Sequence, residues 1–232
     1  MRIAVPAFAS VAVAMAISGC GASEGPTANT SPASSAASTP SVSTSPTSAP
    51  PAPVEPQIEQ LSKTALTKAL LTLDDMPNGY ADTTTKADQV DDGGTYCDYK
   101  RPHPNKTFVT RTFTKGGGFD AELISPTIRQ YASPAQAKAS MEKLLETLET
   151  CKKFTSDGES LNVAKVKAEQ AGEMSVAVRL EGSNFTVIQG YALVGPSVVA
   201  IGTGGVTSVD TDVVGPLLKE QVDRYTAAAQ QS

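Results

Sequence analysis

Residues Met174–Gly202, MSVAVRLEGSNFTVIQGYALVGPSVVAIG, decide the fold. Large apolar residues alternate with small or polar ones along Met174–Glu181. In the next run, alternate positions form one face that consists of Phe185, Val187, Gln189, Tyr191 and Leu193. This alternation is the period of a β-strand with one buried face. Ser197–Gly202 is a third strand-like run and is strongly apolar. Short turn sequences, Gly-Ser-Asn and Gly-Pro, separate the runs, and such connections join antiparallel neighbours. The stretch therefore predicts an antiparallel meander.

The sequence on both sides of the meander predicts three helices and further strands. Apolar residues recur at three- and four-residue spacing in the helical segments, which is the signature of an amphipathic helix. These segments are Ser62–Leu73, Ser133–Phe154 and Asp212–Ala228. The additional strand-like runs are Tyr96–Tyr99, Phe108–Phe113, Phe119–Tyr131 (with Leu123, Ile124 and Ile128 as its buried residues) and Leu161–Ala168. We therefore expect an α+β fold, in which helices pack on one face of an antiparallel β-sheet.

The segment Ser133–Phe154 is the clearest helix of the chain. Ser133 can cap its first turn, and Pro134 suits the first helical position. Its apolar face consists of Ala137, Met141, Leu144, Leu145, Leu148 and Cys151. We interpret this helix as a structural cover over the sheet. We expect any ligand contact to lie away from it, on the sheet or at a glycine-rich loop.

Residues 1–20, MRIAVPAFASVAVAMAISGC, are typical of an export signal. Arg2 precedes an apolar run, Ile3–Ile17, that is shorter than the roughly 20 residues needed to span a bilayer. The run ends in Ile17-Ser18-Gly19-Cys20, which resembles the lipobox of bacterial lipoproteins. The resemblance implies that residues 1–19 are a signal peptide and that the Cys20 thiol carries a diacylglyceryl group with palmitate-like chains. The alternative is an ordinary signal peptide with an incidental cysteine.

Residues 20–57 are predicted to be the lipidated cysteine and a tether rich in Ser, Thr, Pro and Ala. Such a composition buries too little apolar surface to offset the entropy of ordering, so we expect a disordered region. Fully extended, the tether would reach about 115 Å at roughly 3.1 Å per residue. Residues 58–232 are long enough for a single extracytoplasmic domain. We expect that domain at the outer face of a bacterial cell membrane, attached by two or three acyl chains.

The net charge limits the classes of partner that the protein can be expected to bind, and the number of cysteines indicates their oxidation state. The formal net charge is −5 at pH 7, and no basic stripe is present, so nucleic acid is not an expected partner. The chain has 3 cysteines. With Cys20 lipidated, Cys97 and Cys151 remain as an even pair in an exported chain, and we expect them to form a disulfide. The alternative is two buried free thiols.

The sequence contains no recognisable catalytic or metal-binding set. His103 is the single histidine, so a Ser-His-Asp or Cys-His arrangement would have to use it. We interpret it as a solvated loop residue. Zinc would lack ligands, and Asp88, Asp91 and Asp92 do not follow the spacing of a calcium loop. We therefore expect a protein that is not an enzyme and has no cofactor or metal, with a Ser-dependent hydrolase as a less favoured alternative.

Three features together suggest a family. They are Leu70–Tyr80, LLTLDDMPNGY; the capped helix with Ala137 that ends in Cys151-Lys152-Lys153-Phe154; and the apolar meander with its closing helix. Over residues 60–229 the chain resembles the PknH-like extracellular sensor domains of actinobacterial lipoproteins and receptor serine/threonine kinases. Members typically have two disulfides, whereas this chain can form one. The resemblance implies an α+β sheet with a cleft that binds an unidentified ligand or envelope component, and it implies no catalytic residues.

Our leading hypothesis from the sequence is a lipid-anchored extracytoplasmic binding or sensor-like module. We expect a small molecule or envelope ligand in a groove of the sheet, with Arg111, Phe113, Gln189 and Tyr191 as candidate contacts. The alternative is an envelope interaction or structural lipoprotein that docks a membrane-protein partner. Gly116-Gly117-Gly118 is interpreted either as a hairpin turn or as a mobile loop at the mouth of a cleft.

Overall fold

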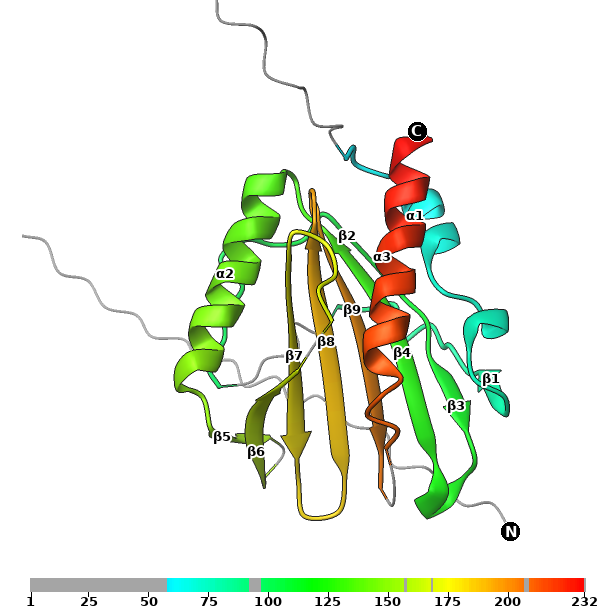
Figure 1. Cartoon of the computed structure of the whole chain (residues 1–232), viewed down its shortest axis with the longest axis vertical. Coiled ribbons are helices and arrows are strands. Elements are labelled where there is room, and N and C mark those ends of the chain that lie inside the picture. The colour runs from blue at the N-terminus through cyan, green and yellow to red at the C-terminus, as the bar shows by residue number, and fades with distance from the viewer. Residues whose placement is uncertain (1–57, 92–96, 157, 168, 207–208, 232) are drawn as a thin grey trace, which may run out of the picture. The chain divides into compact units, whose positions relative to one another are not determined.

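The computed structural model describes residues 58–91, 97–156, 158–167, 169–206 and 209–231. The predicted signal peptide, Cys20 and the tether lie outside these residues. Within the described ranges, nine strands form one antiparallel sheet and three α-helices pack against it (Figure 1). The same ranges contain no helix that is both long enough and apolar enough to span a lipid bilayer.

The sheet has the strand order β1-β3-β4-β9-β8-β7-β6-β5, and β2 also pairs with β4. Its strands are β1 Tyr80–Asp82, β2 Thr107–Thr110, β3 Phe113–Lys115, β4 Glu122–Gln130, β5 Lys153–Ser156, β6 Glu159–Val166, β7 Met174–Glu181, β8 Thr186–Val194 and β9 Ser197–Gly205. Each paired neighbour is antiparallel. The predicted meander is therefore confirmed as β7 to β9, and the strand predicted over Leu161–Ala168 extends it as β6. Strand β9 also pairs with β4.

The predicted helices are also present, and each begins or ends within a few residues of the expected position. They are α1 Lys63–Ala69, α2 Pro134–Thr150 and α3 Val214–Gln230, with short 3-10 turns at Leu73–Asp75 and Gly118–Asp120. The N-cap of α2 is as expected, because the Ser133 side chain accepts a hydrogen bond from the Gln136 N–H. However, α2 ends at Thr150 rather than Phe154, because Lys153–Ser156 pairs with β6 as an edge strand.

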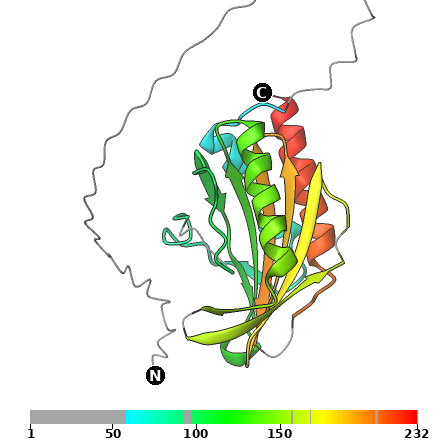
Figure 2. The ribbon, with the colours of Figure 1, turned by 90° about the vertical axis from the view of Figure 1, so that its left-hand side faces the viewer.

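The helices cover both faces of the sheet, which corrects the expectation that they share one face. On β8, Ile188 and Ala192 belong to one core with α1 and α3. Leu193, the next residue, belongs to a second core with α2. Successive strand residues point to opposite faces, so the two cores lie on opposite sides of the sheet. Strands β7 and β8 accordingly run between α2 and α3 in Figure 1, and Figure 2 shows α2 from its own side. Because the central strands are apolar on both faces, their sequence does not reveal which helix covers which face.

The disulfide between Cys97 and Cys151 is present and joins the segment before β2 to the C-terminal end of α2. The two Cα atoms are 5.7 Å apart, which is within the usual range for a bridge.

The predicted strand over Tyr96–Tyr99 is not formed in the described part of that run. Cys97 and Asp98 lie in a turn with φ values of 57° and 58°, and this left-handed backbone does not continue a β-ladder.

The run Phe108–Phe113 is divided into β2 and β3, which lie end to end along the same edge of β4. The break lies opposite Pro126, whose carbonyl accepts a hydrogen bond from the Arg111 N–H at 3.1 Å. Proline has no N–H to return that bond, so the ladder is interrupted there.

Gly116-Gly117-Gly118 connects the antiparallel β3 and β4, which confirms the hairpin interpretation. Leu123 was expected to be buried, but 42% of its surface is exposed.

Two buried glutamines fix the N-terminal segment to the rest of the domain. The Gln130 side chain bonds both the N–H and the carbonyl of Leu61, each at 2.8 Å. Gln221 of α3 accepts from the Leu71 N–H at 2.9 Å and donates to the Ala69 carbonyl at 2.7 Å. These bonds satisfy the Ala69 carbonyl in the last turn of α1 and backbone groups of the residues on either side of this helix.

Candidate functional site

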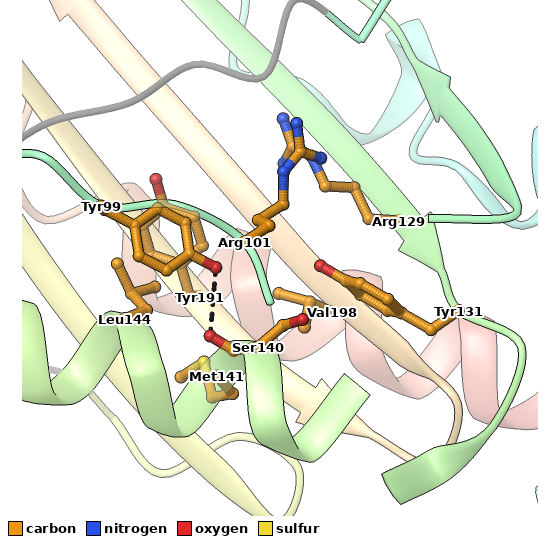
Figure 3. A pocket seen from close by; sticks show the side chains of 9 residues that line it. All are labelled: Tyr99, Arg101, Arg129, Tyr131, Ser140, Met141, Leu144, Tyr191 and Val198. Atoms are coloured by element: carbon orange, nitrogen blue, oxygen red, sulfur yellow. Dashed lines mark hydrogen bonds between the residues drawn. The ribbon is translucent and has the colours of Figure 1, made fainter. Parts of the chain in front are cut away.

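The candidate site is a small pocket between α2 and the sheet, with a volume of about 50 Å³ (Figure 3). Its lining residues come from segments that are far apart in the sequence: Tyr99 and Arg101 before β2, Arg129 and Tyr131 at the end of β4, Ser140, Met141 and Leu144 on α2, Tyr191 on β8 and Val198 on β9. The volume is smaller than the roughly 300–1,000 Å³ of drug-sized ligand sites. The pocket therefore fits a compact chemical group.

Strand register brings the sheet residues of the pocket together. Arg129 and Val198 are direct partners across β4 and β9, and Val198 is also the partner of Leu193 on β8. Tyr191 lies two residues before Leu193, so it shares the same face. Opposite them, α2 presents Ser140, Met141 and Leu144 at helical spacing from its buried side.

The disulfide and one hydrogen bond hold the remaining wall in place. Tyr99 lies two residues after Cys97, whose sulfur is bonded to Cys151 at the end of α2. The Tyr99 hydroxyl donates to the Ser140 carbonyl at 3.1 Å, as Figure 3 shows. Burial raises the pKa of Tyr99, so this phenol is protonated at neutral pH and serves as a donor.

Two arginines at the pocket share one carboxylate. Asp91 Oδ1 accepts from Arg101 Nη2 at 3.1 Å, and Asp91 Oδ2 accepts from Arg129 Nε at 3.3 Å. Arg101 also donates to Asn105 Oδ1 at 3.0 Å. Burial lowers the pKa of Arg101, but the hydrogen bonds and charge of Asp91 raise it by more, so the net shift is upward. The two guanidinium groups and this carboxylate together carry a net positive charge.

Two further hydroxyl groups belong to buried residues that line the pocket. Ser140 is 1% exposed, and its Oγ has no hydrogen-bond partner among the described residues. Tyr131 is also 1% exposed, and its hydroxyl points into the pocket in Figure 3. By contrast, the Tyr191 hydroxyl donates to Gln189 Oε1 at 2.7 Å. The pocket thus combines cationic donors with two hydroxyls that can bond a ligand.

The four contacts predicted from the sequence do not converge on one site. Tyr191 lines the pocket and Gln189 is hydrogen-bonded to it, as their shared strand face predicted. Phe113 is 0% exposed in the core with α1 and α3, on the opposite face, which removes it from the candidate contacts. Arg111 is half-buried at the junction of β2 and β3 and is not among the residues that line the pocket.

The pocket also lies against α2, contrary to the expectation that contacts would avoid this helix. Sequence reasoning missed Arg101, Arg129, Tyr131 and Ser140. Ser140 offered the one available signal, because it is a polar residue between Ala137 and Met141 on the apolar stripe of the helix.

In one further hollow of the described surface, the polar side chains interact with one another. A hollow of about 340 Å³ includes Tyr80, Lys115 and Glu122. There the Tyr80 hydroxyl donates to Glu122 at 3.2 Å, and Lys115 lies 3.6 Å from the same carboxylate. Burial and this hydrogen bond raise the pKa of Tyr80 to about 12. In the described part of the chain, no cluster of three or more His, Cys, Asp or Glu side chains could hold a metal ion.

Comparison with known proteins identifies the fold. No family model and no curated protein sequence matches the chain. The crystal structure of the extracellular domain of PknH from Mycobacterium tuberculosis matches with a TM-score of 0.53 at 10% identity, covering 73% of this chain and 99% of that one. An uncharacterised protein from Mycobacterium smegmatis matches with a TM-score of 0.33 at 16% identity, covering 52% of this chain and 64% of that one. The second similarity is too low to support an argument. The first shows that this chain has the fold of the PknH extracellular domain, as the sequence resemblance implied.

Proposed function

We propose that this protein is a lipid-anchored extracytoplasmic binding module of the sensor-like type, and that it acts by binding rather than by catalysis. The lipobox at Cys20 and the similarity in fold to an extracellular domain support the location. The pocket between α2 and the sheet is the proposed binding site. The observation that carries this proposal concerns Ser140, which lines the pocket and whose buried Oγ has no hydrogen-bond partner among the described residues.

We choose this pocket as the binding site because a buried hydroxyl without a hydrogen bond, such as that of Ser140, destabilises the folded protein. Burying a polar group without a hydrogen bond costs about 1–3 kcal/mol, and native folds contain few such groups. A ligand that bonds Ser140 would recover this energy. Because the pocket walls come from α2, the sheet and the segment around Tyr99, a bound ligand would also stabilise the relative position of these three parts. This coupling would provide the conformational readout that a sensor needs.

Native mass spectrometry of the full chain, extracted from membranes in mild detergent, tests the proposal. The expected result is a co-purifying species of discrete mass. A Ser140→Val variant, which adds bulk inside the pocket, should lose this species. An Ala135→Val variant adds similar bulk at an exposed position of the same helix and should retain it. If the wild-type chain carries no bound species, or if Ser140→Val retains it, the proposed site is wrong.

A second candidate function is docking of a membrane protein, and one surface feature favours it. Phe119 at the tip of the β3–β4 hairpin is 79% exposed, and Leu123 and Val206 are each 42% exposed. Leu123 pairs with Gly204, two residues before Val206, so these apolar side chains gather near one end of the sheet. Exposed apolar clusters of this kind mark interaction surfaces.

Photo-crosslinking in cells tests the docking function. A crosslinker at position 119 should capture one stoichiometric partner, while a crosslinker at the exposed Glu142 on α2 should not. Equal capture from both positions would count against a specific docking surface at the hairpin.

A further inference from the structure

We propose that the pocket between α2 and the sheet recognises an oxyanion, either a carboxylate or a phosphate, at one end of its ligand. This inference rests on the proposed function and specifies its chemistry. Arg101 and Arg129 contribute only hydrogen-bond donors, and the hydroxyls of Ser140 and Tyr131 can donate as well. No carboxylate lines the pocket itself among the described residues. A cation would therefore meet repulsion, whereas an anion would meet complementary donors.

The arginines keep donors available after their contacts with the protein are satisfied. The hydrogen bonds of Arg101 use Nη1 and Nη2, and those of Arg129 use Nε and Nη2. Within the described residues, Arg101 Nε and Arg129 Nη1 make no hydrogen bond. Arg129 is also held in position by the Phe108 ring, 5.1 Å from its guanidinium carbon. Guanidinium groups that are fixed in this way bind carboxylate and phosphate with directional, charge-assisted bonds.

Asp91 acts in this proposal as an internal competitor of the ligand. Its carboxylate already accepts hydrogen bonds from both arginines, and its negative charge opposes a second anion nearby. This arrangement satisfies the buried arginines when no ligand is bound, and it lowers the affinity for the oxyanion. Removal of the Asp91 charge should therefore strengthen binding rather than weaken it.

The small volume limits how much of the ligand enters. About 50 Å³ accommodates a compact oxyanion but not a sugar ring or a lipid chain. The apolar lining residues Met141, Leu144 and Val198 contribute no further polar contacts. The structure therefore assigns to the pocket the charged end of a ligand whose remaining part stays outside it.

Calorimetric titration of the full chain in detergent at low ionic strength tests this inference, because salt screens the interaction. The probes are acetate and inorganic phosphate, and acetamide is the neutral counterpart of acetate. We expect at least one oxyanion to bind, and acetamide to bind at least tenfold more weakly than acetate if acetate is the preferred ion. Binding of acetate alone indicates a carboxylate ligand, and binding of phosphate alone indicates a phosphate ester. Absence of binding by both, or equal binding of acetamide and acetate, would overturn the inference.

Charge variants give a second measurement. Arg129→Gln should weaken binding of the preferred oxyanion about tenfold or more, whereas Lys219→Gln, which removes an exposed charge on α3, should leave it unchanged. Asp91→Asn should strengthen binding about tenfold. Equal effects of Arg129→Gln and Lys219→Gln would also overturn the inference. If Asp91→Asn does not fold, the comparison of acetate with acetamide in the unchanged chain decides.

The two proposals can fail separately. A neutral species that co-purifies with the chain and is lost in Ser140→Val would support the binding function and refute the oxyanion. Specific oxyanion binding in a chain that carries no native ligand would support the pocket chemistry and contradict the expected co-purifying ligand.

Discussion

Ser140 lies on the apolar stripe of α2, where the helical period places a core residue, yet no described protein atom bonds its hydroxyl. We predict that Ser140→Ala raises the free energy of unfolding of the ligand-free protein by about 1 kcal/mol, because it removes a buried polar group. Ser133→Ala in the same helix should lower it by about 1 kcal/mol, because that hydroxyl caps the Gln136 N–H. Denaturant unfolding measures both values. A loss of stability in Ser140→Ala would contradict the assignment of its hydroxyl to a ligand.

Gln221 illustrates the opposite case, a buried polar side chain whose bonds are all used by the fold. Gln221→Ala would leave the Leu71 N–H and the Ala69 carbonyl unpaired in the interior. We expect a loss of about 2–4 kcal/mol, since each buried unpaired group costs about 1–3 kcal/mol. Gln230→Ala, at an exposed position of the same helix, should change stability little. Similar melting temperatures for the two variants would show that these bonds contribute little.

At the level of elements, the disulfide links the two walls of the pocket. It joins the segment that carries Tyr99 and Arg101 to the end of the helix that carries Ser140. In the chain-entropy model, closing a loop with a sequence separation of 54 residues stabilises the fold by about 4 kcal/mol.

We predict that the double variant Cys97→Ser/Cys151→Ser loses up to about 4 kcal/mol of stability and binds the pocket ligand more weakly, because one wall is no longer tethered. Unfolding by denaturant and titration with the preferred oxyanion measure the two effects. The double variant of Ser133→Ala and Gln230→Ala leaves the disulfide intact and controls for a general loss of stability. Unchanged affinity in the cysteine variant would show that the hydrogen bonds of Tyr99 and Arg101 position this wall without the disulfide.

At the level of the whole molecule, α1 and α3 cover one face of the sheet, and α2 covers only part of the other. Ser125, Gln189 and Gly202 remain half-buried on the face that carries α2. The part of the ligand that stays outside the pocket would have access to this surface, which is a feature of the complete sheet rather than of any one element.

The proposed lipid anchor is also a property of the whole chain. We predict that Cys20→Ser releases the protein from the membrane fraction, because in our proposal the acyl chains on Cys20 provide its attachment. Cys151→Ser removes a different cysteine and should leave the protein in the membrane fraction. A Cys20→Ser chain that still fractionates with membranes would contradict lipid anchoring. Fractionation and intact mass measurement check both variants.

The sequence by itself determined most of the elements of this protein, but not the short strands β1 and β5 or the break between β2 and β3. The meander, the three helices and the Ser133 cap follow from periodicity, turn residues and local hydrogen bonding, which depend on neighbours within a few positions. The Cys97–Cys151 pairing followed from counting, since lipidation of Cys20 would leave only two cysteines. The alternation of β8 also placed Gln189 and Tyr191 correctly on one face.

Only the tertiary structure decided which face each helix covers and where the pocket lies. Arg101, Arg129 and Ser140 meet through strand register, the disulfide and the packing of α2, and each of these contacts joins residues that are distant in the sequence. The sequence around Phe113 predicts a strand but does not show whether the face that carries Phe113 is exposed. In the structure this face packs against α1 and α3. Local periodicity separates the two faces of a strand, whereas the position of the rest of the chain determines which face is covered.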